Sequence, residues 1–231
     1  MKRTEGNWLM PRVHLVLSQK GGVGKTTIAV NLAAVVAQTL GSDPAAPTVM
    51  VASIDPQASA VWWANRTDLD TLPFDFEQVD DRPDDVAALK KREEYEHIFI
   101  DAPGSLARPA VLARAMDSSD DVVVPLILEP LAYGPTERTV LDMIQPRGLP
   151  YRIVRNLWDR RDGRTDLELT TKWLDTQGFR YTNTVIRKYK MHSTASAEGR
   201  VCTQYPSGRT ASEAQNDFLQ LALELGYGGT V

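Results

Sequence analysis

Residues 13–37 have the sequence VHLVLSQKGGVGKTTIAVNLAAVVA, in which three types of local composition follow one another without a break. The apolar run at 13–17 predicts a short buried strand. A glycine-rich turn follows, and the Ala-rich segment 26–40 predicts a helix. A buried strand, a tight turn and a helix in direct succession predict the first unit of a parallel α/β sheet.

The backbone of the turn is suited to surrounding a phosphate group. Gly21, Gly22 and Gly24 permit backbone conformations that other residues avoid. Successive amides, that of Val23 included, can therefore point inward at phosphate oxygens. The N-terminus of the following helix adds the positive end of its dipole. The turn thus predicts a phosphate-binding loop.

The side chains after the last glycine fit the same chemistry. The Lys25 ammonium can reach the β- and γ-phosphates of a nucleotide, and the Thr26 hydroxyl is a ligand for Mg²⁺. Thr27 can hydrogen-bond to the α-phosphate. The alternative, a turn that only caps an ordinary helix, does not account for a lysine and a hydroxyl at this spacing after a buried strand. We therefore expect ATP and Mg²⁺ as cofactors.

Strands and helices alternate along the rest of the chain. The predicted strands are 13–17, 49–54, 98–100, 122–128 and 151–154, with a short one at 74–79. The predicted helices are 26–40, 59–66, 83–91, 109–116, 135–144, 167–177 and about 212–225. This alternation predicts an α/β fold of the P-loop NTPase type, a mostly parallel twisted sheet with helices on both faces. We expect a single domain over residues 1–231, with 1–11 as a lead-in.

Two aspartates follow predicted strands, at the sheet edge where ligands bind in open α/β folds. Asp55 comes after the strand 49–54, and Asp101 follows 98–100 and precedes a flexible Ala-Pro-Gly turn. Behind a phosphate loop, Asp101 is expected to hold Mg²⁺ through water, and the region of Gly104 to sense the γ-phosphate. Taken alone, each aspartate is also typical of a turn or a helix cap.

Length and composition bound the remaining possibilities. The 231 residues suit one domain, and a hydrophobic fraction of 42% is enough for a full core. Cys202 is the only cysteine, which excludes a disulfide framework and an iron–sulfur cluster. No stretch approaches the roughly 18 consecutive apolar residues of a membrane-spanning helix, and the N-terminus lacks the apolar run of a signal peptide. We expect a cytoplasmic protein with no membrane partner.

The net charge of −4 conceals an uneven distribution. Residues 1–146 carry −8, residues 147–209 carry +7, and the remaining tail carries −3. A basic region of this kind predicts contacts with DNA phosphates, and the alternative is a solvated surface of helices and loops. The side chains proposed to contact DNA without reading its sequence are Arg152, Arg155, Arg160, Arg161, Arg164, Arg187, Lys188, Lys190 and Arg200.

The loop departs from the general GxxxxGK[ST] pattern at its start. Gln19 stands at the place of the first glycine, and a second lysine, Lys20, follows it. The string KGGVGKTT resembles the deviant Walker A loop of the ParA/MinD superfamily, in which this extra lysine reaches across an ATP-dependent homodimer to the partner's phosphates. The resemblance implies that Lys20 acts in trans, much as an arginine finger does. The alternative is an exposed charge on the loop.

Other segments carry the same resemblance. SIDPQAS at 53–59 is similar to the first switch of ParA proteins, written DxDPQ, which implies that Asp55 helps to organise the attacking water and Mg²⁺. Ser53 replaces the first aspartate of that motif, so this chain lacks one outer carboxylate. IDAPGS at 100–105 is similar to the second switch. An asparagine that ends a later strand contacts adenine in the family, which implies this role for Asn156, and a buried turn is the alternative.

The resemblance covers most of the chain and is to a small ParA-type partition ATPase. We expect no N-terminal helix-turn-helix domain, because about ten residues precede the first strand. Glu213, Asp217 and Glu224 make the terminal helix acidic, unlike the basic membrane-binding helix of MinD-like proteins. The resemblance implies a nucleoid-associated, weak ATPase that dimerises on ATP and binds DNA non-specifically. It would drive partition of plasmid, phage or chromosomal DNA with a centromere-binding ParB-like partner that stimulates hydrolysis.

Two other functions stay open on the sequence. A positioning ATPase of the same fold would distribute a protein cargo over the nucleoid. An ATP-dependent metabolic ligase would use the phosphate loop to activate a carboxylate substrate. The pair Trp62 and Trp63 lies either in the core or near a partner.

Overall fold

The computed structural model describes residues 10–55, 72–79, 82–104 and 108–228. Seven strands in these ranges form one sheet in the order β3-β2-β4-β1-β5-β6-β7, and every neighbouring pair is parallel. The strands are β1 Arg12–Val16, β2 Val49–Ser53, β3 Asp75–Gln78, β4 His97–Asp101, β5 Asp121–Ile127, β6 Tyr151–Trp158 and β7 Tyr181–Arg187. All strands therefore end at the same edge of the sheet.

The register of the central strands brings distant segments of the chain together at that edge. The last residue of β1, Val16, pairs with Asp101 of β4, and Ser53 of β2 pairs with Asp101 from the other side. On the opposite flank, Val16 pairs with Val123 of β5. The loop after β1 thus lies between the segments that follow β4 and β5.

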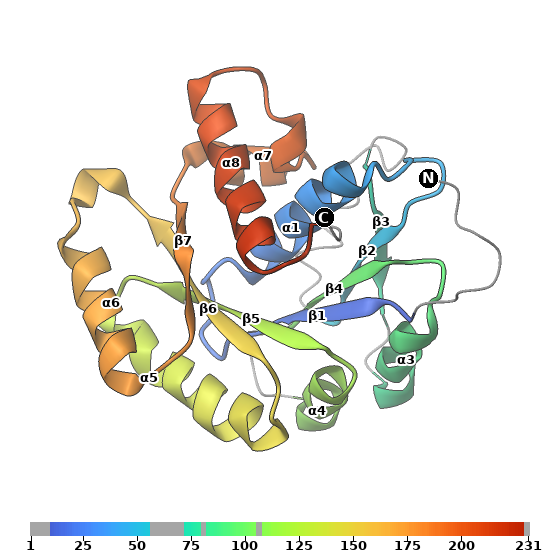
Figure 1. Cartoon of the computed structure of the whole chain (residues 1–231), viewed down its shortest axis with the longest axis horizontal. Helices are drawn as coiled ribbons and strands as arrows, with labels where there is room; N and C mark the ends of the chain where they lie inside the picture. The colour runs from blue at the N-terminus through green and yellow to red at the C-terminus, as the bar shows by residue number, and fades with distance from the viewer. Residues whose placement is uncertain (1–9, 56–71, 80–81, 105–107, 229–231) are drawn as a thin grey trace.

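Helices cover both faces of the sheet (Figure 1). One face carries α1, α7 and α8, and the other carries α3, α4, α5 and α6. Their bounds are α1 Lys25–Leu40, α3 Pro83–Ala88, α4 Pro109–Asp117, α5 Pro130–Arg138, α6 Thr165–Gln177, α7 Lys190–Ala197 and α8 Arg209–Glu224. A π-helical segment, Thr139–Ile144, continues α5. Short 3₁₀ turns occupy Leu89–Lys91, Gln145–Arg147, Arg160–Asp162 and Cys202–Gln204.

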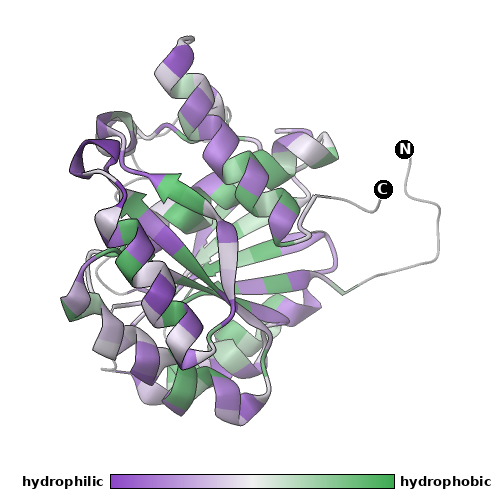
Figure 2. Cartoon of the chain, turned by 60° about the vertical axis from the view of Figure 1, so that its left-hand side comes forward, coloured by the Kyte–Doolittle hydropathy of each residue, from purple (hydrophilic) through white to green (hydrophobic). Residues whose placement is uncertain are grey.

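Apolar side chains fill both layers between the sheet and its helices. In Figure 2 the strands are largely hydrophobic and the outward helix surfaces are hydrophilic. Helix α1 is buried along most of its length because it lies between the sheet and α8. Phe218 and Leu221 of α8 are completely buried against it, which closes that face of the core.

A cluster of polar side chains lies at the start of the central strands, at the edge of the sheet opposite the loop between β1 and α1. His14 Nδ1 lies 3.0 Å from Asp121 Oδ2, and His14 Nε2 lies 2.8 Å from His97 Nδ1. The Tyr227 hydroxyl donates to Asp121 Oδ1 at 2.6 Å and so attaches the segment after α8 to the sheet. Burial, with the charges of His14 and Arg12, lowers the pKa of His97 to about 3, so His97 is neutral in the folded protein.

The predicted fold class is confirmed, with two differences in detail. Strand β7 and helix α7 have no counterpart among the predicted elements, and the sequence of β7, YTNTVIR, lacks the apolar run of a buried strand. The helix predicted from Pro135 begins at Pro130 and contains Pro135 in its interior. The helix predicted at 59–66, with Trp62 and Trp63, lies outside the described residues.

Among the described helices, none combines the length and the apolar character needed to span a bilayer.

Candidate functional site

The loop between β1 and α1 is the centre of the site. Gly22 and Gly24 have φ values of 74° and 85°, in the left-handed region that favours glycine. Gly24 also has a steric reason to lack a side chain, since a Cβ there would lie 2.6 Å from Asn156 Nδ2. The loop therefore depends on glycine at this position for both its backbone conformation and its packing.

Asn156, at the end of β6, holds the loop from the side. Its Nδ2 donates to the carbonyl oxygen of Val23 at 2.7 Å, and the residue is 1% exposed. The next residue, Leu157, has a φ of 58°, which is unusual for a residue with a Cβ and interrupts the pairing of β6 with β7. The structure thus assigns Asn156 a contact with the loop itself, and its predicted contact with adenine stays a prediction.

Lys25 and Gly104 meet across the loop. A Cβ on Gly104 would lie 3.1 Å from Lys25 Nζ and 3.4 Å from the Cα of Gly21. Burial lowers the pKa of Lys25, and the carboxylates of Asp101 and Asp55 act in the opposite direction. The segment after β4 therefore lies directly over the lysine that is predicted to bind phosphate.

Thr26 and Asp101 form the polar centre of the site. The Thr26 hydroxyl donates to Asp101 Oδ2 at 2.7 Å, while Oδ1 has no hydrogen-bond partner among the described residues. Burial raises the pKa of Asp101 to about 7, against the hydrogen bond from Thr26 and the charge of Lys25. A buried carboxylate oxygen with unused lone pairs beside a hydroxyl is an oxygen donor set of the type that Mg²⁺ prefers. These residues fit a Mg²⁺ ion.

The first predicted switch begins at the end of β2. Ser53 is completely buried, and its Oγ accepts a hydrogen bond from the Asp55 N–H at 3.4 Å. Asp55 is half-buried and lies near enough to Lys25 and Asp101 for its charge to raise both of their pKa values. The residues from Pro56 to 71, and 105–107 of the second switch, lie outside the described ranges.

Lys20 differs from Lys25 in its surroundings. It is half-buried, and its backbone N–H donates to Ser18 Oγ at 3.3 Å. In the ranges that the structure describes, its ammonium forms no ion pair or hydrogen bond. A lysine ammonium on the loop that has no partner among the described residues is available to an anion of a second subunit.

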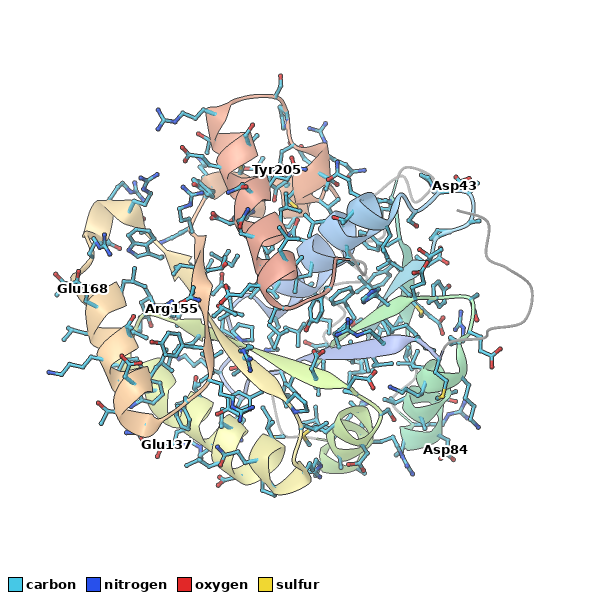
Figure 3. All side chains as sticks on the ribbon, viewed as in Figure 1. Asp43, Asp84, Glu137, Arg155, Glu168 and Tyr205 are labelled. Carbon is cyan, nitrogen blue, oxygen red and sulfur yellow. The ribbon has the colours of Figure 1, made fainter. Side chains whose placement is uncertain are left out.

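The basic residues predicted to contact DNA do not share one surface. Arg155 is 6% exposed and donates to Thr171 Oγ1 and the Thr182 carbonyl, inside the fold beside α6 and β7 (Figure 3). Arg187 forms ion pairs with Asp217 and Glu213 of α8. The prediction that Arg155 contacts DNA is therefore wrong, because its side chain is buried inside the fold. Arg187 is half-buried and paired with two carboxylates, and its contact with DNA stays a prediction.

Of the other seven basic residues, Arg200 is exposed after α7 and pairs with Glu198, and the remaining six lie at opposite edges of the sheet. Arg152 lies near the start of β6, on the edge opposite the phosphate loop. A second group, which we call the basic loop cluster, lies on exposed segments after β6 and β7, at the edge of the phosphate loop. It consists of Arg160, Arg161, Arg164, Lys188 and Lys190. The Lys188 N–H donates to the Trp158 carbonyl at 2.8 Å, which joins the two segments.

Comparison with known proteins places this geometry in a family. The model of the CobQ/CobB/MinD/ParA nucleotide-binding domain matches residues 14–220. The chain belongs to this family. The predicted ParA/MinD relationship is thereby confirmed.

Individual relatives extend the comparison. The chain is 35% identical to "Maintenance of carboxysome distribution protein A" of Gloeobacter kilaueensis over 215 residues, which covers 93% of this chain and 94% of that protein. Its fold is similar to the ATP complex of a Cyanothece McdA variant, with a TM-score of 0.70 and 13% identity, covering 96% and 99% of the two chains. It is also similar to a plasmid partition protein from Borrelia burgdorferi, with a TM-score of 0.61 and 16% identity, covering 94% and 100%.

Replacing Gly24 by alanine tests the packing of the loop. We expect Gly24→Ala to weaken nucleotide binding about tenfold or more, since the added Cβ collides with Asn156 and disfavours the left-handed backbone. Gly41→Ala is the matched control, because Gly41 also has a positive φ, of 65°, but open space around it. Both variants should lose stability, and only Gly24→Ala should lose affinity, measured by titration calorimetry with ADP. Equal affinities would contradict the proposed role of this packing.

The pH dependence of stability tests the burial of Asp101. Its pKa rises from 3.8 in the unfolded chain to about 7 on folding, so between these values the folded state binds more protons. The free energy of unfolding of nucleotide-free protein should therefore fall as the pH rises from about 4 to 7.

Asp101→Asn removes this titration and still accepts the hydrogen bond from Thr26. We expect urea unfolding to show wild type and variant to be similar near pH 4, and the variant more stable at pH 8, by at most about 4 kcal/mol. A difference between the two proteins that does not change with pH would show that Asp101 has no raised pKa.

Proposed function

We propose that this chain is an ATP-dependent dimerising switch that binds DNA and positions a cargo on it. The observation that carries the proposal is the arrangement of Lys25, Thr26 and Asp101 around the loop, with Gly104 over Lys25. ATP would bind with its phosphates along the loop amides, from Gly21 to Gly24, and on Lys25, Thr26 and Thr27. Asn156 would lie close to the base while it supports Val23.

The metal would be held by the Thr26 hydroxyl and, through water, by Asp101 and Asp55. When bound, Mg²⁺ supplies positive charge that offsets the charge of the β- and γ-phosphates. Asp55 would orient the attacking water. We expect slow intrinsic hydrolysis, because the described residues around the loop offer no strong general base apart from these carboxylates.

Two subunits would meet at the edge where the strands end. Lys20 would cross to the partner's phosphates, where its charge is neutralised only in the dimer. Gly104 lies beside both Lys25 and Gly21, so a γ-phosphate on Lys25 would displace the segment after β4. Loss of the γ-phosphate would return that segment to the loop and open the dimer.

DNA would bind the basic loop cluster, which lies at the same edge. Arg161 is 85% exposed on its side chain, and Lys188 is exposed beside it. Dimerisation would double the number of phosphate contacts, and affinity rises steeply with that number at low salt. The sequence of the DNA would not be read, because the cluster offers charge on loops rather than an element that enters a groove.

A protein cargo is the proposal that the relatives favour. Similarity to a carboxysome distribution protein over nearly the whole of both chains supports the positioning of a protein assembly. Partition of DNA with a ParB-like partner is the second candidate, supported by the fold shared with the Borrelia partition protein.

ATP-dependent DNA binding tests the switch. We expect wild type to bind a fluorescent duplex of arbitrary sequence only with ATP, with affinity falling as salt rises. Arg161→Glu and Lys188→Glu should each weaken binding about tenfold. Arg180→Glu is the control, since Arg180 is exposed at the opposite edge of the sheet, before β7, and it should change affinity less than about threefold.

Three results would contradict this proposal. They are DNA binding that ignores ATP, ATP-driven dimerisation that survives Lys20→Ala, and ATP turnover that depends on a small carboxylic acid in place of DNA and a protein.

The cargo is tested by isolating the ATP-bound dimer from its native host with a tagged chain and a slowly hydrolysed ATP analogue. We expect an adaptor of a protein assembly to be retained with the analogue, to be lost with ADP, and to accelerate ATP hydrolysis when purified. Lys25→Ala is the control that retains no partner in either state. Recovery of a centromere-binding protein in its place would favour the DNA partition function.

A further inference from the structure

Gln19 is held on three sides by one short stretch of helix. Its backbone N–H donates to Thr139 Oγ1 at 3.2 Å, and its side-chain Nε2 donates to Met143 Sδ at 3.2 Å. Its Oε1 accepts a hydrogen bond from Arg138 Nε at 3.4 Å. The residue at the start of the phosphate loop is thus fixed in both backbone and side chain by residues 138–143.

The helix is irregular at this contact. Pro135 lies inside α5 and has no N–H to donate, and the segment from Thr139 continues as a π-helix. The Thr139 hydroxyl donates to the Pro135 carbonyl at 2.8 Å, and this bond orients its oxygen to accept from Gln19. Thr139 is completely buried. Thr139 and Met143 are four residues apart, so both side chains lie on the face of the segment that is turned toward Gln19.

Lys20 follows directly. The residue before it, Gln19, is held by Thr139, and the Lys20 N–H donates to Ser18 Oγ. The Lys20 ammonium has no partner in the described part of the chain. A long side chain that must reach a group outside its subunit loses conformational entropy when it does so. The entropy loss is smaller when the backbone conformation already points the side chain toward the group that it binds.

We propose that Gln19 is a positioning residue for Lys20. It ties the backbone before Lys20 to the α5–π-helix segment and so aims the lysine out of its own nucleotide site, toward the second subunit. A glycine at this place, as in the general loop pattern, has no side chain with which to make two of the three contacts. The inference rests on the proposed function, because it needs the ATP-dependent dimer.

Variants of Gln19 and Thr139 distinguish an effect on the orientation of Lys20 from an effect on the folding of the loop. Gln19→Leu keeps the approximate size of the side chain and removes its polar contacts, and Thr139→Val removes the acceptor for the Gln19 N–H. We expect both to weaken dimerisation about tenfold with a slowly hydrolysed ATP analogue, and to change monomer affinity for ADP less than about threefold. Thr139→Ser retains the hydroxyl and should behave as wild type. Sedimentation over a range of protein concentrations gives the dimer constants.

A double-mutant cycle with Lys20→Ala decides how Gln19 acts. If it acts through Lys20, Gln19→Leu adds less than about twofold to the loss already caused by Lys20→Ala. Additive losses, or an ADP affinity reduced as much as dimerisation, would overturn the inference and show that Gln19 holds the whole loop.

The failure of this inference is distinct from that of the proposed function. A wild type that does not dimerise on ATP would refute the function. A wild type that dimerises through Lys20, with Gln19→Leu and Thr139→Val unaffected, would refute only the role of Gln19.

Discussion

Two opposite charges, those of Lys25 and Asp101, are buried together where β1 and β4 end, and burial disfavours both of them. It lowers the pKa of the lysine and raises that of the aspartate. Their mutual attraction and the Thr26 hydroxyl offset only part of this cost. A ligand that places an anion beside the lysine and a cation beside the carboxylate would stabilise the charged forms of both side chains. The stability of this region is thereby coupled to a nucleotide and its metal.

The shape of the loop depends on contacts from three distant parts of the chain. Asn156 of β6 holds the Val23 carbonyl, Gly104 after β4 lies over Lys25, and the π-helical segment after α5 holds Gln19. Each contact comes from the last residues of a strand or from a segment that follows a strand, so each is placed by the parallel order of the sheet. The loop is therefore in direct contact with the segment after β4 and with the π-helical segment after α5.

The surfaces proposed for the second subunit and for DNA lie at the same edge of the sheet as the nucleotide. The basic loop cluster follows β6 and β7, and the backbone bond from Lys188 to Trp158 joins its two parts. Carboxylates of α8 neutralise the basic side chains closest to the fold, as Glu213 and Asp217 do for Arg187. In the basic loop cluster, Arg160, Arg161 and Arg164 also pair with carboxylates, those of Glu213, Asp159 and Glu168, but these arginines are exposed. The charge proposed to contact DNA is therefore on the exposed loops. This arrangement allows one nucleotide-dependent dimer interface to set the spacing of two such clusters.

The sequence by itself determined the type of fold, the position of the phosphate loop and the family, because these depend on local order: a strand, a glycine turn, a helix, and carboxylates after later strands. Local patterns could not show β7, whose residues alternate too weakly, or that α5 runs through Pro135, since in both cases packing overrides local preference. Only the tertiary structure separated Arg155 and Arg187 from the exposed basic residues and revealed the contacts of Gln19 and Asn156. The physical reason is that burial and hydrogen-bond partners come from other elements of the fold, from 16 residues away, as for Arg155 and Thr171, to 133 residues away, as for Asn156 and Val23, which the packing of the sheet and its helices brings together.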